Sequence, residues 1–438
     1  MTLSQDKVNI TFDVVIIGGG ASGMACALHL FGMLKTSGKK CLRVALLEKN
    51  QRLGKKLLLT GNGRCNITNK SISHDNYHGK HERFCLPALS AFDNQATIRF
   101  FEGLGLLTFF DETGKAYPES LHASSVLDCM RFALEETGYS IMFSTEIKNI
   151  EKTHDGFRLF ASNGNILQAT CVVVACGGSA SPFTGSDGSG FNLLRMLGCR
   201  IEDPIPGIVQ IKTETDFVKP VSGIKIIGTA TLKADEKTVR VETGEILFTD
   251  YGLSGPPILR LSGWASRLFA RHGSDRSKPD VKISLDLIPQ RGEDDVLRLL
   301  KERREAYPDR LIEQFLVGIF HNRLASRLLK SIFDIPLSRS VSTLSDEDLI
   351  RIASGIKHTN IRVTGVMPLS NAQVTIGGAD TDQFDPHTMS SLIHRGLYAC
   401  GEVLDIDGDC GGYNLQWAWA SAYLTARSIA DRIGKENL

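Results

Sequence analysis

The sequence lacks an excess of charge of either sign. Its 438 residues include 50 Lys and Arg against 49 Asp and Glu, for a formal net charge of +1. A chain so balanced exerts no general attraction on nucleic acid or on an anionic membrane surface. We therefore expect a small-molecule substrate, no nucleic-acid partner and no membrane partner, while the oligomeric state stays open.

Long apolar runs and paired cysteines are also missing. No stretch approaches the roughly 20 apolar residues that cross a bilayer. The first residues are polar and a strand follows within a dozen positions, so no secretory signal is expected. Ten cysteines are scattered along the chain without a C-x-x-C pair, which is typical of reduced thiols. These features predict a cytoplasmic protein.

Two further patterns resemble reactive centres and do not meet their requirements. Cys171 and Cys176 have the C-x4-C spacing of a redox disulfide. Along a strand, however, five steps separate them by about 16 Å, whereas a disulfide needs Cα atoms about 4.4–6.8 Å apart. The histidines at 74, 78 and 81 show no metal-ligand spacing with nearby carboxylates, so we expect surface histidines and no metal.

The sequence does contain one strong pattern close to its start. Val14 to Ile17 is a continuous apolar run, as in a parallel strand buried on both faces, and it leads directly into Gly18-x-Gly20-x-x-Gly23 and an Ala-rich helix. In such a turn Gly18 permits the bend, Gly20 lets a pyrophosphate approach the backbone, and Gly23 lets the helix pack on the strand. This pattern predicts a dinucleotide-binding Rossmann unit.

An acidic residue follows at the spacing that this interpretation requires. Arg43 to Lys49 predicts the second strand, with Glu48 at its end. A carboxylate there accepts hydrogen bonds from ribose hydroxyls. The alternative, a solvated glutamate at a strand end, is weaker because the glycine pattern precedes it.

Two glycine-rich loops follow later strands of the same pattern. Residues 51–69 mix Gly, Asn and basic residues, and Arg52, Lys55 and Arg64 are candidates for phosphate contacts. The alternative is a solvated turn with no role in binding. Residues 401–416 combine Gly-Glu with a Gly-Gly-Tyr-Asn run and lead into the last helix. Its free N–H groups could stabilise negative charge on a flavin ring.

The order of patterns along the chain predicts an α/β fold in three parts. A discontinuous Rossmann-like FAD-binding domain takes residues 1–194 and 377–438, a β-barrel-like domain takes 195–293 and 357–376, and a helical insert takes 294–356. Within the first part, 157–160 and 166–169 predict a hairpin, followed by a separate returning strand at 171–176. The helical insert is expected to act as a lid that contacts substrate, with a dimerisation element as the alternative.

These stretches together resemble the BaiN-like, or YhiN-type, flavoproteins, also described as aminoacetone-oxidase-type FAD-binding enzymes. The resemblance rests on Gly18–Gly23, 60–68, 177–188, 247–256 and 401–417, and it covers essentially the whole chain. It implies FAD held without a covalent bond and the same three parts. Asp250 and Lys115 depart from the family pattern, which usually has His and Arg there, so no acid or base role is carried over to position 250.

The resulting expectation is an FAD-dependent oxidoreductase. NADH or NADPH would act as a transient electron donor, and the substrate would be a small molecule with an activated, enone-type C=C bond. An amine or other oxidase that uses oxygen, a non-enzymatic flavin sensor and an RNA-modifying flavoenzyme are the alternatives. The catalytic residues stay unknown. The residues expected to bind the cofactor are Gly18, Gly20, Ala21, Ser22, Gly23, Glu48, Lys49, Arg52, Lys55, Gly61, Asn62, Arg64, Cys65, Asn66, Ile147, Ala175, Gly177, Gly401, Glu402, Gly412, Tyr413, Asn414 and Leu415.

Overall fold

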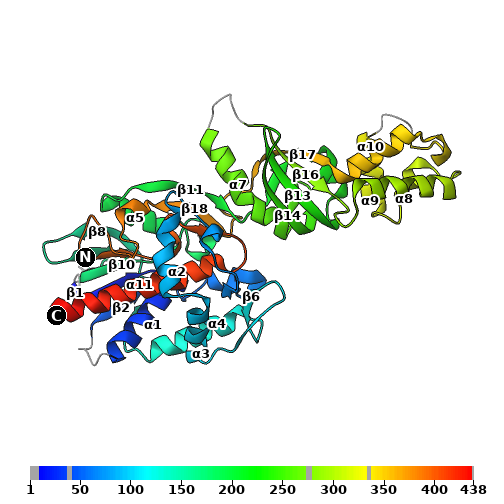
Figure 1. Cartoon of the computed structure of the whole chain (residues 1–438). Coiled ribbons are helices and arrows are strands. Elements are labelled where there is room, and N and C mark those ends of the chain that lie inside the picture. The colour runs from blue at the N-terminus through cyan, green and yellow to red at the C-terminus, as the bar shows by residue number, and fades with distance from the viewer. Residues whose placement is uncertain (1–8, 37–41, 273–278, 333–336, 437–438) are drawn as a thin grey trace, which may run out of the picture. The chain divides into compact units, whose positions relative to one another are not determined.

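The computed structural model describes residues 9–36, 42–272, 279–332 and 337–436. The chain forms two compact units, the first made of residues 1–205 and 373–438 and the second of 206–372. The first unit is therefore discontinuous, because the second is inserted between its parts. The expected α/β fold with a Rossmann-like unit and a barrel is confirmed (Figure 1). The boundaries of the three expected parts remain a prediction.

A seven-stranded sheet organises the first unit, in the order β7-β2-β1-β10-β9-β8 with β19 also paired to β10. Strands β2, β1, β10 and β19 run parallel, which requires helical crossovers and leaves both faces covered. Helices α1 and α11 pack side by side (Figure 1). The sheet strands are β1 Asn9–Ile17, β2 Val44–Leu47, β7 Ser140–Met142, β8 Ile147–Lys152, β9 Phe157–Ala161, β10 Ile166–Val174 and β19 Leu397–Ala399.

The remaining elements of the first unit carry the loops and helices around this sheet. The helices are α1 Ala21–Thr36, α2 Leu86–Ala91, α3 Asn94–Gly103, α4 Ala123–Glu135, α5 Ser189–Met196 and α11 Tyr413–Glu436. Short strands outside the main sheet are β3 Thr68–Asn69, β4 Tyr77–His78, β5 Thr108–Phe110, β6 Lys115–Pro118, β11 Ile201–Gly207, β18 Val374–Ala379 and β20 Asp407–Gly408. The 3-10 turn η1 Leu57–Gly63 lies within the long loop after β2.

The second unit is a closed barrel with helices attached. The barrel order is β12-β15-β14-β13-β16-β17, so every strand is paired on both sides and no edge is left open. Its strands are β12 Ile211–Thr213, β13 Lys225–Ala234, β14 Lys237–Phe248, β15 Gly252–Ser254, β16 Val281–Asp286 and β17 Thr359–Val366. Its helices are α6 Thr215–Val218, α7 Pro256–His272, α8 Glu293–Ala306, α9 Asn322–Ile332 and α10 Asp346–Lys357.

The helical block of the second unit shares a core with the barrel. Leu300 on α8, Leu328 on α9 and Ile352 on α10 belong to the same buried cluster as Ile283 and Leu285 on β16. Helix α10 begins with a capping box: Ser345 Oγ accepts from Asp348 N at 3.1 Å, and Asp348 Oδ2 accepts from Ser345 N at 3.0 Å. The helices therefore stabilise the barrel by burial as well as extending it.

Candidate functional site

The predicted cofactor motifs meet at one edge of the first unit's sheet. Ile17 lies opposite Leu47 on one side and Val174 on the other, and Val174 lies opposite Ala399. These four residues end parallel strands in register. The segments that follow them therefore emerge at the same edge, which is where α/β sheets bind ligands. The segments are Gly18–Gly23, Glu48–Arg52, Ala175–Gly177 and Gly401–Glu402.

The glycine turn has the geometry of a phosphate cradle. A Cβ on Gly18 would lie 2.4 Å from Ala175 O, and one on Gly23 would lie 1.9 Å from Gly18 O, so both positions require glycine. A Cβ on Gly20 would meet no protein atom within 4 Å. The space beside Gly20 is therefore open at the N-terminus of α1, where Ala21 and Ser22 begin the helix and its free N–H groups could bind an anion.

Glu48 is buried at the end of β2 and is already held by hydrogen bonds. Its Oε2 accepts from Gly19 N at 2.9 Å, and its Oε1 accepts from the backbone and side-chain nitrogens of Asn50 at 2.8 and 2.7 Å. A carboxylate offers about four acceptor positions, so one remains for a ribose hydroxyl. Next to it, Lys49 Nζ pairs with Asp187 Oδ1 at 2.6 Å.

The loop after β2 bends sharply around Asn66. Asn62 and Cys65 have positive φ angles of 55° and 60°, which is uncommon for residues other than glycine. Asn66 is 8% exposed, and its Oδ1 is buried without a hydrogen-bond partner among the described residues. A Cβ on Gly61 would lie 2.9 Å from Asn66 N, and one on Gly412 would lie 2.8 Å from Asn66 Oδ1. A buried acceptor without a donor is costly, so this atom fits an N–H group of a bound ring.

The turn before α11 is held by its own side chains. Gly408 N donates to Asn414 Oδ1 at 2.8 Å, and Asn414 Nδ2 donates back to Gly408 O at 2.7 Å. Gln416 is fully buried, and its Oε1 accepts from Thr68 at 2.6 Å and from Thr97 at 2.8 Å. This packing positions Gly412, Tyr413 and Leu415 rigidly beside the Asn66 loop.

Glu402 is joined to a lysine that the sequence analysis did not select. Lys56 Nζ pairs with Glu402 Oε2 at 2.8 Å, and Glu402 Oε1 accepts from Thr375 N at 2.7 Å. The expected site residue Lys55 instead donates to Phe183 O at 2.8 Å and is exposed, as is Arg52. The sequence alone does not indicate which of the adjacent residues Lys55 and Lys56 has its side chain directed inward.

The other predicted site residues occupy separate surroundings. The exposed Arg64 guanidinium lies 5.0 Å from the centre of the Tyr117 ring. Burial raises the pKa of the Cys65 thiol to about 12, so this thiol is protonated at neutral pH. Ile147 opens β8, and Ala175 and Gly177 directly follow β10. The described part of the chain contains nine of the ten cysteines, and none of the nine forms a disulfide, which includes Cys171 and Cys176.

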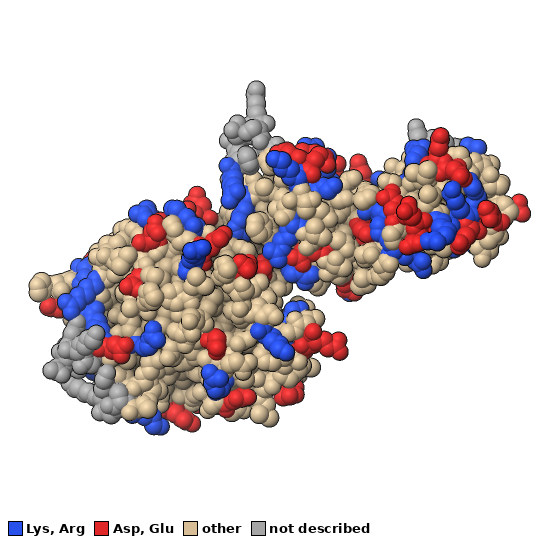
Figure 2. Space-filling view, in the orientation of Figure 1, with Lys and Arg blue, Asp and Glu red and all other residues tan. Residues whose placement is uncertain are grey.

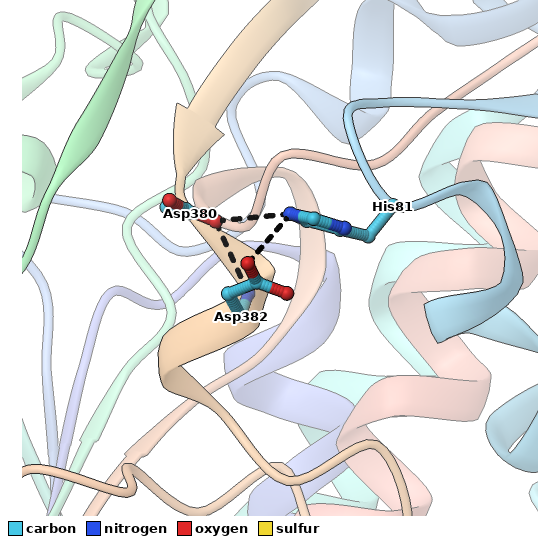
Figure 3. Close-up of side chains that lie close together, drawn as sticks. All are labelled: His81, Asp380 and Asp382. Carbon is cyan, nitrogen blue, oxygen red and sulfur yellow. Dashed lines mark hydrogen bonds and ion pairs between the residues drawn. The ribbon is translucent and has the colours of Figure 1, made fainter.

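Two histidines expected on the surface have aspartate partners distant in sequence. His78 Nε2 lies 3.0 Å from Asp409 Oδ1, with side chains 13% and 11% exposed. Figure 3 shows His81 pointing toward Asp380 and Asp382; its Nε2 lies 3.5 Å and 3.1 Å from their carboxylates. The simple surface assignment is therefore wrong for His78, which is mostly buried, because partners across the fold are invisible in local spacing.

The group formed by His81, Asp380 and Asp382 has the composition of a metal site, but its charges are already matched. Asp380 is fully buried, and its Oδ2 accepts from Arg200 Nε at 3.0 Å and Lys80 Nζ at 3.3 Å. Burial opposes ionisation, yet the hydrogen bonds from the Asp382 backbone, Arg200 and Lys80 hold the pKa of Asp380 below its usual value. Two bound cations disfavour a third, so we interpret this group as an ion-pair network.

The parallel sheet, the phosphate cradle and the two loops define a flavin-dependent oxidoreductase with a Rossmann-type fold. A family model described as "HI0933-like protein Rossmann domain" matches residues 12–428, and the chain belongs to this family. The resemblance to BaiN-like and YhiN-type proteins is thereby confirmed.

Two curated relatives span almost the whole chain. The 3-dehydro-bile acid delta(4,6)-reductase of Clostridium scindens is 34% identical over 420 residues, which cover 95% of this chain and 98% of the relative. The ribosomal RNA dihydrouridine synthase of Escherichia coli is 28% identical over 421 residues, with the same coverage of 95% and 98%. A solved quinol-fumarate reductase is 13% identical with a TM-score of 0.50, covering 98% of this chain and 72% of its own; it supports the fold alone. None of the described helices combines the length and apolarity required to span a membrane.

Proposed function

We propose that this protein reduces a carbon–carbon double bond conjugated to a carbonyl group, with FAD as the hydride carrier. The observation that carries the proposal is the shared chemistry in the names of the two relatives. A 3-dehydro Δ(4,6) bile acid contains double bonds conjugated to a 3-oxo group, and dihydrouridine forms when the uracil C=C bond next to a carbonyl is saturated. Both relatives match this chain over 95% of its length.

The site geometry supports a flavin in this role. The Gly20 cradle would hold the pyrophosphate, Glu48 would hold a ribose, and Asn66 with Gly412 would border the ring. Bound FAD would supply two-electron hydride chemistry. The first N–H groups of α11 would stabilise negative charge on the ring, and the surrounding loops would exclude water. Because the chain has no second nucleotide fingerprint, NADH or NADPH would bind transiently as the donor.

A small-molecule enone is the substrate class we favour. The net charge of +1 gives no general attraction for RNA, and on the face seen in Figure 2 basic and acidic side chains are interspersed over the described part of both units. The expectation of no nucleic-acid partner remains a prediction.

A uridine in RNA is the second candidate, and one structural observation favours it. Arg52, Lys55 and Arg64 are exposed on the loop after β2, and within the described chain none forms an ion pair with a carboxylate. Cations placed near a site and left unpaired are suited to phosphate contacts.

Product analysis tests the proposal and separates the candidates. Purified holoprotein would be incubated without oxygen with NADH or NADPH and either a steroid 4-en-3-one or a uridine-containing RNA. Protein stripped of FAD is the matched control. We expect the enone product to gain two hydrogens by mass spectrometry. A gain of two hydrogens in the RNA and not in the enone would support uridine in RNA as the substrate. Oxidation of an amine in the presence of oxygen, with neither acceptor reduced, would contradict the proposal and support an oxidase.

A further inference from the structure

The tyrosine on β6, Tyr117, carries a hydroxyl without a protein partner. The residue is 6% exposed, and its hydroxyl forms no hydrogen bond with any residue of the described chain. The backbone around it is fixed, since Phe109 on β5 lies opposite Tyr117 and Thr68 on β3 lies opposite Ala116. Hydroxyls on buried side chains are normally hydrogen-bonded, so the partner of this one is expected from outside the protein chain.

The hydroxyl end of Tyr117 faces the loop that carries Asn66. A Cβ on Gly61 would lie 3.4 Å from Tyr117 Cε1, 2.9 Å from Asn66 N and 3.6 Å from Asn66 Cβ. Because Cε1 is bonded to the carbon that bears the hydroxyl, this end of the tyrosine and Asn66 adjoin the same side of Gly61. Asn66 Oδ1 is likewise buried without a partner in the described chain, and it faces Gly412 on the turn before α11. Two unpartnered polar groups, an acceptor and a hydroxyl, therefore adjoin one short loop.

These two groups match the two molecules that the proposed reaction requires. The Asn66 oxygen can accept from the imide N–H of an isoalloxazine ring. A substrate has to lie against that ring to receive a hydride, so it would occupy space beside the same loop. The Tyr117 hydroxyl, on the side of Gly61 that also faces Asn66, is placed to meet such a substrate.

Arg64 supplies a positive charge next to this hydroxyl. Its guanidinium lies 5.0 Å from the centre of the Tyr117 ring and forms no ion pair with a carboxylate of the described chain; its Nε donates to Gly61 O at 3.4 Å. Burial raises the pKa of Tyr117, and the Arg64 guanidinium opposes this effect. The phenol is therefore protonated at neutral pH, and the tyrosinate left by proton transfer would face a cation.

Neighbouring acidic hydrogens are less available. The Tyr77 hydroxyl donates to Tyr413 O at 3.1 Å, and its residue is 1% exposed. The Cys65 thiol is fully buried, and burial raises its pKa to about 12. Tyr117 combines an uncommitted hydroxyl with a neighbouring cation.

We propose that Tyr117 donates the proton that completes reduction of the conjugated double bond, an inference that rests on the proposed function. One carbon of the bond accepts the hydride supplied by the reduced cofactor. The carbon next to the carbonyl accepts the proton: the O–H bond of Tyr117 breaks and a C–H bond forms. Arg64 stabilises the tyrosinate, which regains a proton from water. The substrate gains a hydride and a proton, and the reduced cofactor loses the hydride.

Separate half-reactions test this role. Tyr117→Phe would be compared with wild type and with Tyr307→Phe, a matched control in which an exposed tyrosine also lies under an arginine, 3.8 Å from Arg310. Each FAD-loaded protein would be reduced with dithionite, then mixed with a 4-en-3-one or with oxygen. We expect Tyr117→Phe to slow reoxidation by the enone about 100-fold, within the range for general acids, and to leave reoxidation by oxygen unchanged. Tyr307→Phe should match wild type.

Two further measurements separate proton transfer from packing. Binding of the enone to oxidised holoprotein, followed by the change in the flavin spectrum, should be the same in Tyr117→Phe as in wild type, because the proton is transferred after binding. Arg64→Met should slow reoxidation by the enone about tenfold, and Arg64→Lys, which keeps the positive charge, should slow it less.

The outcomes distinguish failure of the inference from failure of the proposed function. A wild-type rate of reoxidation by the enone in Tyr117→Phe would overturn the inference alone. Loss of FAD from this variant, or an equal slowing with enone and with oxygen, would show that Tyr117 has a structural role and would also overturn it. Reduced wild-type protein that no enone reoxidises would overturn the inference together with the proposed function.

Discussion

Gly20 and Gly23 differ in what surrounds them, and this difference gives the sharpest test of the phosphate cradle. A Cβ on Gly20 meets no protein atom within 4 Å, whereas a Cβ on Gly23 would lie 1.9 Å from the Gly18 carbonyl oxygen. Gly20→Val should therefore fold normally and fail to hold the cofactor. Gly23→Val should fail to fold, because a backbone oxygen cannot yield at that distance.

The size of the Gly20 effect follows from the contacts that valine would displace. Hydrogen bonds to a charged group contribute about 1.5–3 kcal/mol each, and the valine side chain would occupy the space of at least one phosphate contact. A loss of about 3 kcal/mol corresponds to an affinity reduced roughly 100-fold. The melting temperature of the FAD-free Gly20→Val protein should stay within about 3 °C of FAD-free wild type, since no core contact changes.

The assay is titration of FAD-free protein with FAD, followed by quenching of flavin fluorescence, with melting curves of the same samples. Gly23→Val serves as the matched control for a folding defect. Wild-type FAD affinity in Gly20→Val would refute the placement of the pyrophosphate. Loss of the folded state in Gly20→Val, as expected for Gly23→Val, would refute the claim that the space beside Gly20 is open.

Three further predictions concern the cofactor, a thiol and a histidine. Flavin released by heat should chromatograph as FAD, because the Gly20 cradle and Glu48 are expected to contact the adenosine half of the cofactor. Release of FMN would contradict this prediction. Cys65→Ser should keep at least about a tenth of turnover, because burial raises the pKa of this thiol to about 12 and disfavours a thiolate nucleophile; total loss with FAD bound would count against it. Burial lowers the pKa of His29 to about 3 from 6.5. The unfolded chain therefore takes up a proton first, and the stability present above pH 6.5 is lost as the pH falls toward 3. His29→Phe should show a smaller drop in melting temperature from pH 7 to pH 5 than wild type, and an equal drop would show that His29 is not responsible.

Local patterns were sufficient to predict the scaffold of the site. The apolar run before Gly18 and the acidic residue at 48 are each recognisable from a few neighbouring residues. Parallel pairing of the strands then brings the ends of these strands together. The boundaries of the strands could not be predicted as well from local patterns. A hairpin strand at 166–169 and a returning strand at 171–176 were expected, whereas the structure has one continuous strand, β10 Ile166–Val174. It pairs antiparallel with β9 and parallel with β1, so one segment serves both expected roles.

Contacts between distant segments could not be predicted from spacing. The Lys56–Glu402 and His78–Asp409 pairs join residues 346 and 331 positions apart. Each depends on the sheet having already brought two loops together. The orphaned Asn66 oxygen is likewise a property of its surroundings, because the sequence shows an asparagine in a glycine-rich loop and not whether a donor faces it.

Anaerobic stopped-flow spectroscopy of the holoprotein tests the central claim most directly. The bound flavin would be reduced with NADH or NADPH and then mixed with a 4-en-3-one or with oxygen. We predict that at least one nicotinamide bleaches the flavin and that the enone restores its absorbance faster than oxygen does. Rapid reoxidation by oxygen, with reduced flavin unchanged by the enone or by a uridine-containing RNA, would contradict it.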